Sequence, residues 1–312
     1  MPGPPQRHSF TSPLRYPGGK GAIGNFIKLV LLQNNLLDGD YIEVYAGGAG
    51  IAWPLLFEEY VRRVYINDLS KPLFSFWQSV LEDADRLCQL IHDTPITMRQ
   101  WNRQKIVQKK PDDCSPTELG FSTFFLNRTN RSGILQGGVI GGKKQNSKWK
   151  LDARFNKRDL VERIQRIARY SKRITLCNLD AVDFIKTIVP CLSQKALLYL
   201  DPPYYGKGQE LYENHYSPND HVKLASLISN GIKQPWIVSY DATPEILALY
   251  NRYRSIRYDL SYSAQERYAG AEIMFFSQKL VIPIIDHPAY VRQADLRSSL
   301  FEKAERIVRD NK

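Results

Sequence analysis

The sequence predicts an α/β protein built on a doubly wound parallel sheet, with an inserted lobe and a closing antiparallel hairpin. Short apolar segments alternate along the chain with segments of helical periodicity, which is typical of a parallel sheet covered by helices on both faces. This alternation is lost between residues 92 and 158, where Lys, Arg, Asn and Gly become dense. Two late extended segments, 256–262 and 273–285, predict the terminal hairpin.

Two units of strand and helix precede the insertion. Residues 41–46 are apolar, contain aromatic and β-branched side chains and end in glycines, so they predict a strand, which is followed by a helix over 51–59. Residues 63–66 predict a second strand that ends in an Asn-Asp pair, and apolar residues at helical spacing then predict a helix over 70–91.

The alternation returns after the insertion and ends in a tail. Leu296, Leu300, Ala304 and Ile307 share one face of a helix predicted from residue 290 onward, which suits packing on the outside of the protein. The other predicted elements are strands at 173–177, 196–200 and 236–240 and helices at 181–188, 221–230 and 244–250.

These segments divide the chain into a main domain of residues 10–91 and 159–285, an inserted domain of residues 92–158 and a helical tail of residues 286–312. A chain of 312 residues that is 43% hydrophobic can bury one large core with such an insertion. No apolar run is long enough to span a membrane, and the start of the chain lacks an apolar signal segment. We therefore expect a soluble, cytoplasmic protein with no membrane partner.

The net charge of +11 favours a polyanionic partner, because Lys and Arg side chains that neutralise phosphates release counterions. The four cysteines include no Cys-x-x-Cys pair, and the five histidines are scattered. Neither a metal site nor a disulfide framework is therefore expected.

Four consecutive residues, Asp201-Pro202-Pro203-Tyr204, follow the apolar strand predicted at 196–200. Open α/β sheets bind ligands at the carboxyl ends of their strands, and two prolines hold a stiff turn there. In such a turn the Asp201 side chain and the Pro202 carbonyl can both accept hydrogen bonds from one planar amino group, while Tyr204 stacks on the ring that carries it. The exocyclic amine of a nucleobase fits this arrangement; a surface turn without function is the alternative.

Glycines follow the first predicted strand at Gly47, Gly48 and Gly50, where the backbone turns sharply and a ligand can approach closely. Roughly 20 residues further on, Asp68 ends the second strand, where an acid can bind the two hydroxyls of a ribose. The pair therefore predicts a nucleotide-type cofactor. A dinucleotide site is the alternative, although the glycines at 47, 48 and 50 do not have the spacing Gly-x-Gly-x-x-Gly.

The chain contains five motifs in this order: residues 14–20 (LRYPGGK), 43–50 (EVYAGGAG), 66–68 (IND), 124–129 (FFLNRT) and 201–204 (DPPY). Together they resemble those of the DNA adenine methylase (Dam-like) family. The resemblance implies a Rossmann-like methyltransferase fold with a C-terminal antiparallel hairpin and an inserted target-recognition subdomain. It implies a site-specific enzyme, acting as a monomer and associated with the nucleoid, that moves a methyl group from S-adenosylmethionine to the amino nitrogen of a flipped-out adenine in double-stranded DNA.

The resemblance also assigns roles to individual residues. The cofactor would meet Tyr16 and Lys20 at its methionine end, Asp68 at its ribose and Asp180 at its adenine. An ordinary turn around Tyr16 and a helix N-cap at Asp180 are the alternatives. Asp201 would also border the cofactor, and the catalytic residues would be Asp201, Pro202, Pro203 and Tyr204. The family's Phe-x-Gly-x-Gly turn is here Tyr45, Ala46, Gly47, Gly48 and Ala49.

DNA recognition is expected in the inserted domain. Asn127 and Arg128 match the family's Asn-Arg segment, and Arg131 stands where some relatives carry an aromatic residue. Arg and Asn side chains can bind base edges, while Lys143 and Lys144 suit phosphates. A solvated basic surface without base contacts is the alternative.

Other assignments are also open. In the final hairpin Arg267 and Glu272 resemble a family segment, and pairing with each other across the turn is the simple explanation. Methylation of the cytosine amine, methylation of RNA, and a catalytically silent DNA-binding protein are the alternatives to adenine methylation of DNA. The intact tetrad of residues 201–204 argues against a silent protein, because a binding module has no use for a polar clamp around an amine.

Overall fold

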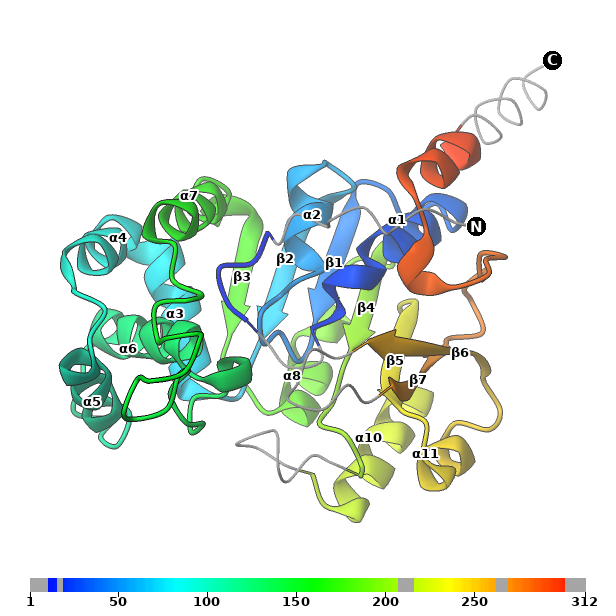
Figure 1. The fold of residues 1–312 in the computed structure, drawn as a ribbon. Coiled ribbons are helices and arrows are strands. Elements are labelled where there is room, and N and C mark those ends of the chain that lie inside the picture. Colours follow the sequence, from blue (N-terminus) through cyan, green and yellow to red (C-terminus); the bar gives the residue numbers. More distant parts are fainter. Residues whose placement is uncertain (1–10, 16–18, 207–215, 262–268, 301–312) are drawn as a thin grey trace.

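The computed structural model of the chain describes residues 11–15, 19–206, 216–261 and 269–300, and within them a mixed sheet of seven strands forms the centre of the molecule (Figure 1). The strand order is β3-β2-β1-β4-β5-β7-β6. Neighbours from β3 to β5 are parallel, and β7 is antiparallel to both β5 and β6. The predicted sheet with a closing hairpin is therefore confirmed. The bounds are β1 Gly39–Glu43, β2 Val61–Asn67, β3 Ile174–Cys177, β4 Ala196–Leu200, β5 Trp236–Asp241, β6 Arg254–Ser261 and β7 Ala269–Phe276.

The chain reverses its course across the sheet between β1 and β4. From β1 it moves outward to β2 and β3, and it then returns to the other side of β1 to add β4 and β5. The carboxyl ends of β1 and β4 therefore lie side by side at the reversal point, which is where open α/β sheets bind ligands. The glycine turn follows β1 and the tetrad follows β4, so both predicted motifs reach this point.

Helices cover both faces of the parallel part of the sheet. Tyr41 and Leu197 pack on one face in a core shared with α1 and α2, while Ile42 and Leu198 pack on the other face with α8, α10 and α11. Every residue of β4 is consequently buried, which explains its continuous apolar sequence. These helices are α1 Gly24–Gln33, α2 Ala52–Phe57, α8 Ala181–Thr187, α10 Pro218–Gly231 and α11 Pro244–Leu249.

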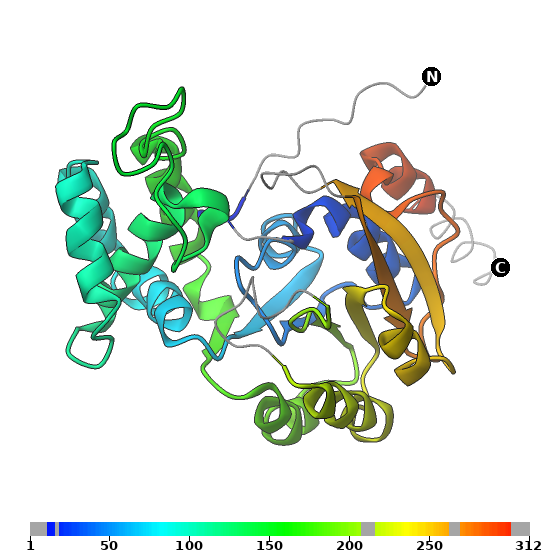
Figure 2. The same ribbon diagram turned by 60° about the horizontal axis from the view of Figure 1, so that its bottom comes forward.

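A second group of helices lies beyond the edge strand β3, at the opposite end of the sheet from the β6–β7 hairpin (Figures 1 and 2). Within it α6 packs against α3 and α5, and α7 packs against α3 and α4. The predicted insertion contributes α5 and α6. Helices that precede and follow the insertion in the sequence pack in the same group. The predicted domain boundaries stay a prediction. The group comprises α3 Lys71–Glu82, α4 Ala84–Asp93, α5 Met98–Val107, α6 Pro116–Thr129 and α7 Lys157–Ala168.

Two predicted elements differ from the structure. The helix expected over 70–91 is divided into α3 and α4, because Asp83 adopts φ −142° and ψ 41° and so leaves the helical conformation. The last extended segment ends at Phe276 and does not continue to residue 285. The chain turns there, since the Leu280 N–H donates to the Ser277 carbonyl at 3.1 Å.

The described part of the tail is helical over residues 293–300. Leu296 is buried there at 1% exposure, whereas Leu300 is 44% exposed. Ala304 and Ile307 lie outside the described residues, so only the first part of the predicted amphipathic helix is observed.

Candidate active site

Asp201 directly follows β4 and is held by two other segments of the chain. Its Oδ1 accepts a hydrogen bond from Ser239 Oγ on β5 at 2.8 Å, and it lies 2.9 Å from Lys20 Nζ. Lys20 opens the 3-10 turn Lys20–Ile23 that leads into α1. The fold therefore brings together the Lys20 and Asp201 motifs, which stand far apart in the sequence.

Lys20 contacts two further polar side chains. Its Nζ donates to the Tyr204 hydroxyl at 3.0 Å and lies 3.4 Å from Glu272 Oε2 on β7. The Tyr204 hydroxyl in turn donates to Glu272 Oε1. The side chains of Lys20 and Glu272 are only 3% and 2% exposed, so one ammonium group is enclosed between two carboxylates and a phenol.

The surroundings shift the ionisation of this cluster. Burial opposes the charged form of Lys20, but Asp201 and Glu272 outweigh it and hold the pKa of Lys20 well above its ordinary value. Burial raises the pKa of Asp201 and Glu272 adds to the rise, while Lys20 and Ser239 oppose it. Shifted pKa values of this kind gather at functional sites, which identifies the cluster as the candidate active site.

The backbone after the tetrad is anchored by Asp241 at the end of β5. Its carboxylate accepts the Tyr205 N–H at 3.0 Å and the Gly206 N–H at 2.9 Å. Neither Ser239 nor Asp241 belongs to a motif in the sequence, although Ser239 lies in the strand predicted at 236–240 and Asp241 directly follows it. No local pattern in the sequence indicates their contacts with residues 201–206, because these contacts depend on the order of strands that brings β5 beside β4.

The glycine turn after β1 is tied to the ends of β2 and α3. Gly47 adopts φ +48°, and its N–H donates to Asp68 Oδ2 at 2.8 Å. Asp68 Oδ1 accepts the Ser70 N–H at 3.0 Å, and the Trp77 indole N–H donates to the Gly47 carbonyl at 3.0 Å. Asp68 and Trp77 thus both hold the glycine turn, and binding of a ribose by Asp68 stays a prediction.

The remaining predicted cofactor residues have mixed environments. Asp180 caps α8, because its Oδ1 accepts the Val182 N–H at 2.8 Å, and its contact with a cofactor stays a prediction. The Tyr45 hydroxyl lies 2.8 Å from the Tyr216 hydroxyl. Ala46 and Gly48 are buried in the turn. Tyr16 lies outside the described residues.

The candidate residues form a row along the carboxyl edge of the sheet. In sheet order, Asp180, Asp68, Gly47 and Asp201 follow β3, β2, β1 and β4. Adjacent strands lie about 4.8 Å apart, so the row spans roughly 14 Å. A glycine turn with an acid on either side suits an extended nucleoside derivative. Among the described residues, no group of three or more His, Cys, Asp or Glu side chains suits a metal ion.

In the segment predicted to read DNA, the side-chain amides of two buried asparagines form hydrogen bonds with the backbone. The Asn127 side chain accepts the Arg15 N–H at 2.8 Å and donates to the carbonyls of Arg15 and Gly133. Asn130 likewise accepts from the Trp101 indole and donates to backbone carbonyls. The sequence predicts a contact between Asn127 and a base edge; in the structure Asn127 is 1% exposed and binds backbone instead.

The predicted cations of this region differ in burial. Arg128 donates from Nε to the Arg154 carbonyl at 2.7 Å, and burial together with the nearby Arg15 and Arg163 lowers the pKa of Arg128 to about 9. Arg131, Lys143 and Lys144 are exposed. Positive charge therefore gathers around Arg128, and three further cations are open to a polyanion.

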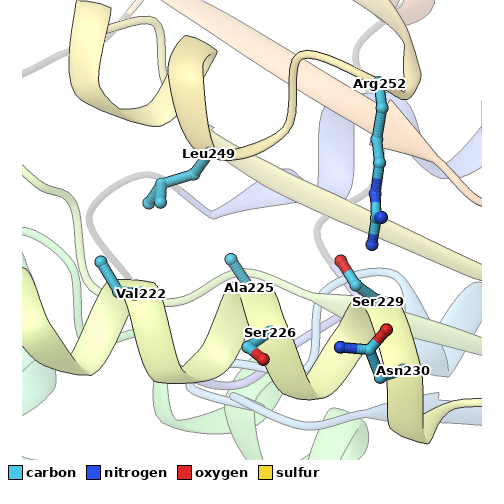
Figure 3. A pocket seen from close by; sticks show the side chains of 7 residues that line it. All are labelled: Val222, Ala225, Ser226, Ser229, Asn230, Leu249 and Arg252. Carbon is cyan, nitrogen blue, oxygen red and sulfur yellow. The ribbon is translucent and has the colours of Figure 1, made fainter.

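A shallow pocket lies elsewhere, between α10 and α11 (Figure 3). Arg252 extends across it toward Ser229 and Asn230 at the end of α10 (Figure 3). None of the tetrad residues lines this pocket, so it is separate from the candidate active site.

The chain matches a protein family and a curated relative. The model of the D12 class N6 adenine-specific DNA methyltransferase family matches residues 16–264. The Type II methyltransferase M.MjaIII from Methanocaldococcus jannaschii is 24% identical over an alignment of 206 residues, and the match covers 61% of this chain and 68% of that protein.

Solved structures resemble the chain more distantly. The rRNA methyltransferase aviRa from Streptomyces viridochromogenes is 11% identical with a TM-score of 0.35, over 85% of this chain and 88% of that chain. Protein LPL1258 from Legionella pneumophila is 12% identical with a TM-score of 0.32, over 92% of each chain. The described residues contain no helix of the length and apolarity that a membrane crossing requires.

Proposed function

Because this chain belongs to the D12 class of N6 adenine-specific DNA methyltransferases, we propose that it transfers a methyl group from S-adenosylmethionine to the exocyclic amino nitrogen of an adenine flipped out of duplex DNA. The observation that carries the proposal is the Asp201 carboxylate. It ends β4, pairs with the buried Lys20 and is itself 23% exposed. A carboxylate that is fixed on one side and open on the other can accept hydrogen bonds from an entering amino group.

The residues of the tetrad hold the amine for a direct transfer. The amino nitrogen of adenine is a weak nucleophile, because its lone pair is delocalised into the ring. Asp201 and the Pro202 carbonyl accept its two hydrogens, favour a more tetrahedral nitrogen and aim the lone pair along the line of attack. S-adenosylmethionine supplies an electrophilic methyl group when bound. The nitrogen loses a proton readily once methylated, so Asp201 acts as an acceptor and need not be a strong base.

The proposed cofactor lies along the carboxyl edge of the sheet. Asp68, which is fixed beside the Gly47 backbone, binds the ribose hydroxyls, and Asp180 binds the adenine end. Tyr16 and Lys20 border the methionine end, next to the tetrad. The pairing of Lys20 with Asp201 supports this order, since it puts the reacting end of the cofactor beside the carboxylate.

The target adenine leaves the duplex in this proposal. Pro202 is buried and Tyr204 is only 8% exposed, so these two residues of the tetrad lie below the surface. A base stacked inside a helix cannot reach such a site, whereas a flipped base can stack on an aromatic side chain. Tyr204 is the ring that the tetrad offers.

Duplex DNA is the proposed partner. The net charge of +11 and the exposed Arg131, Lys143 and Lys144 support contacts with phosphates. Asn127 acts in this proposal by ordering the segment that presents those cations, and Arg128 lies among the positive charges of Arg15, Arg154 and Arg163.

The test is methyl transfer from labelled S-adenosylmethionine to unmethylated duplex DNA, with the product nucleosides separated. The assay compares the wild type with Asp201→Ala and with the control Asp183→Ala, which alters an exposed acid on α8. We expect label in methyladenosine for the wild type and the control, and none for Asp201→Ala. Label only in cytosine, or only in RNA, would overturn the substrate. DNA binding without any label would overturn the catalytic role of Asp201.

A further inference from the structure

Glu272 is a buried charge in an otherwise apolar strand. The four residues that follow it on β7, Ile273 to Phe276, are each at most 3% exposed, and Glu272 itself is 2% exposed. Its register partners are Asp241 on β5 and Tyr258 on β6. A carboxylate in such surroundings costs free energy unless it is paired, so its position requires an explanation.

The contacts of Glu272 point toward the active site. Oε1 accepts the Tyr204 hydroxyl, and Oε2 lies 3.4 Å from Lys20 Nζ. Lys20 also contacts Asp201, and Tyr204 is linked to Asp201 through Lys20. The pairing with Arg267 expected from the sequence cannot be compared, because Arg267 lies outside the described residues.

The oxygens of Asp201 are engaged before any substrate arrives. Lys20 Nζ lies 2.9 Å from Oδ1 and 3.0 Å from Oδ2, and Ser239 also donates to Oδ1. The remaining acceptor position is on Oδ2, which Lys20 also contacts, so an amine that binds there shares this oxygen with Lys20. Because the Lys20 side chain is only 3% exposed, water cannot take over its pairing, and a second carboxylate must remain in contact with it.

We propose that Glu272 is a positioning residue for methyl transfer: it shares the Lys20 ammonium and holds the Tyr204 hydroxyl, so that Asp201 can turn an oxygen to the substrate amine. This inference rests on the proposed function. Glu272 does not touch the substrate, and it acts through Lys20, Tyr204 and Asp201.

The charges around Asp201 give the inference a measurable consequence. Lys20 lowers the pKa of Asp201 and Glu272 raises it, so a neutral residue at 272 lowers that pKa. The acidic limb of the rate profile then moves to lower pH, because Asp201 stays ionised further into acid. Titratable or charged groups that act on this cluster are Lys20, Tyr41, Glu43, Tyr199, Tyr204, Tyr258 and Glu272.

The experiment measures single-turnover methyl transfer over a range of pH, with saturating S-adenosylmethionine and duplex DNA. It compares wild type with Glu272→Gln, Glu272→Asp and the control Asp259→Asn, which changes an exposed acid on β6 of the same hairpin. Glu272→Gln is expected to lower the rate by about 10²-fold through misplacement of Tyr204 and Lys20, with DNA affinity retained and the acidic limb at lower pH. Glu272→Asp is expected to recover part of the rate and to keep the limb where the wild type has it.

An unmoved limb or an unchanged rate in Glu272→Gln would overturn the inference. If that variant fails to fold, Glu272→Asp decides, since a rate equal to that of the wild type would exclude a positioning role. The proposed function fails separately, by absence of methyladenosine in the wild type. The inference about Glu272 would be rejected, and the proposed function kept, by one combination of results. In it the wild type is active, Asp201→Ala is inactive, and Glu272→Gln behaves like Asp259→Asn.

Discussion

The carboxyl edge of the sheet and the segment after α6 use polar side chains in opposite ways. At the edge, Lys20, Asp201 and Glu272 are charged groups that hold one another in the interior. In the segment, Asn127 and Asn130 are neutral and buried and hold backbone, while the cations Lys143 and Lys144 are exposed.

Under the proposed function, this difference separates the residues of the chemistry from those of DNA recognition. Charges that are desolvated and fixed before the substrate arrives can stabilise a transition state without reorganising. Exposed lysine side chains, on a loop whose backbone is bound by buried asparagines, can adjust their positions to phosphates, which every DNA sequence presents. The comparison therefore predicts that changes at the edge alter ionisation and rate, and that changes on the loop surface alter DNA affinity alone.

The largest expected effect is on the buried Glu43 at the end of β1. Burial raises the pKa of Glu43 from 4.5 to about 8, so between these pH values the folded state binds a proton that the unfolded state has released. Stability must therefore fall as pH rises across this interval, by about 5 kcal/mol in all. Glu43→Gln is expected to remove that fall, so its advantage over the wild type grows with pH.

Urea unfolding of both proteins at several pH values measures this difference. Glu245→Gln, an exposed acid on α11, serves as the control and should follow the wild type. If the free energy of unfolding changed with pH in the same way for Glu43→Gln and the wild type, Glu43 would not bind a proton on folding. The carboxyl edge would then be no more sensitive to pH than the loop.

Removal of the Asn127 side chain tests the neutral side of the comparison. Asn127→Ala leaves the Arg15 amide and two carbonyls without their partner, and each such loss costs about 1 to 3 kcal/mol. We expect a loss of about 3 kcal/mol in urea unfolding that does not depend on pH. Asn146→Ala, an exposed site in the same segment, should change stability little. Equal losses for the two variants would contradict an organising role for Asn127.

Loss of the loop lysines should leave the fold intact and weaken DNA binding. In the double variant Lys143→Ala and Lys144→Ala we expect about a tenfold loss of affinity and a salt dependence smaller by about two phosphate contacts. Titration of labelled duplex DNA at several salt concentrations measures both. Lys195→Ala with Lys233→Ala, exposed sites just before β4 and β5, is the matched control. The loop would have no part in binding if the two double variants gave the same salt slope.

The smallest expected effect concerns the turn after β1. Ala49 adopts φ +48°, which costs an L-residue roughly 1 to 2 kcal/mol and costs glycine little. Ala49→Gly should therefore stabilise the protein by about 1 kcal/mol in thermal unfolding. Ala225→Gly within α10 should have the opposite sign. A destabilised Ala49→Gly variant would show that the buried methyl group outweighs the strain.

The sequence by itself determined the local elements and the motifs that follow them. The strand predicted at 196–200 coincides with β4, because five consecutive apolar residues followed by two prolines encode both a buried strand and its end. The glycine turn and Asp68 were likewise readable, since tight turns and acids at strand ends depend on neighbouring residues. The family motifs in their order were enough to predict the fold class and the enzyme family.

Only the tertiary structure decided which side chains meet. Ser239 and Glu272 contact the cluster around Asp201 because the sheet order sets β5 beside β4 and β7 beside β5. Asn127 faces backbone because the chain before α1 crosses its helix end, which no local pattern encodes. Strand order and burial arise from contacts between distant parts of the chain. The physical reason is that a polar side chain has the same local sequence whether it is buried against a partner or left in solvent, and only packing distinguishes the two.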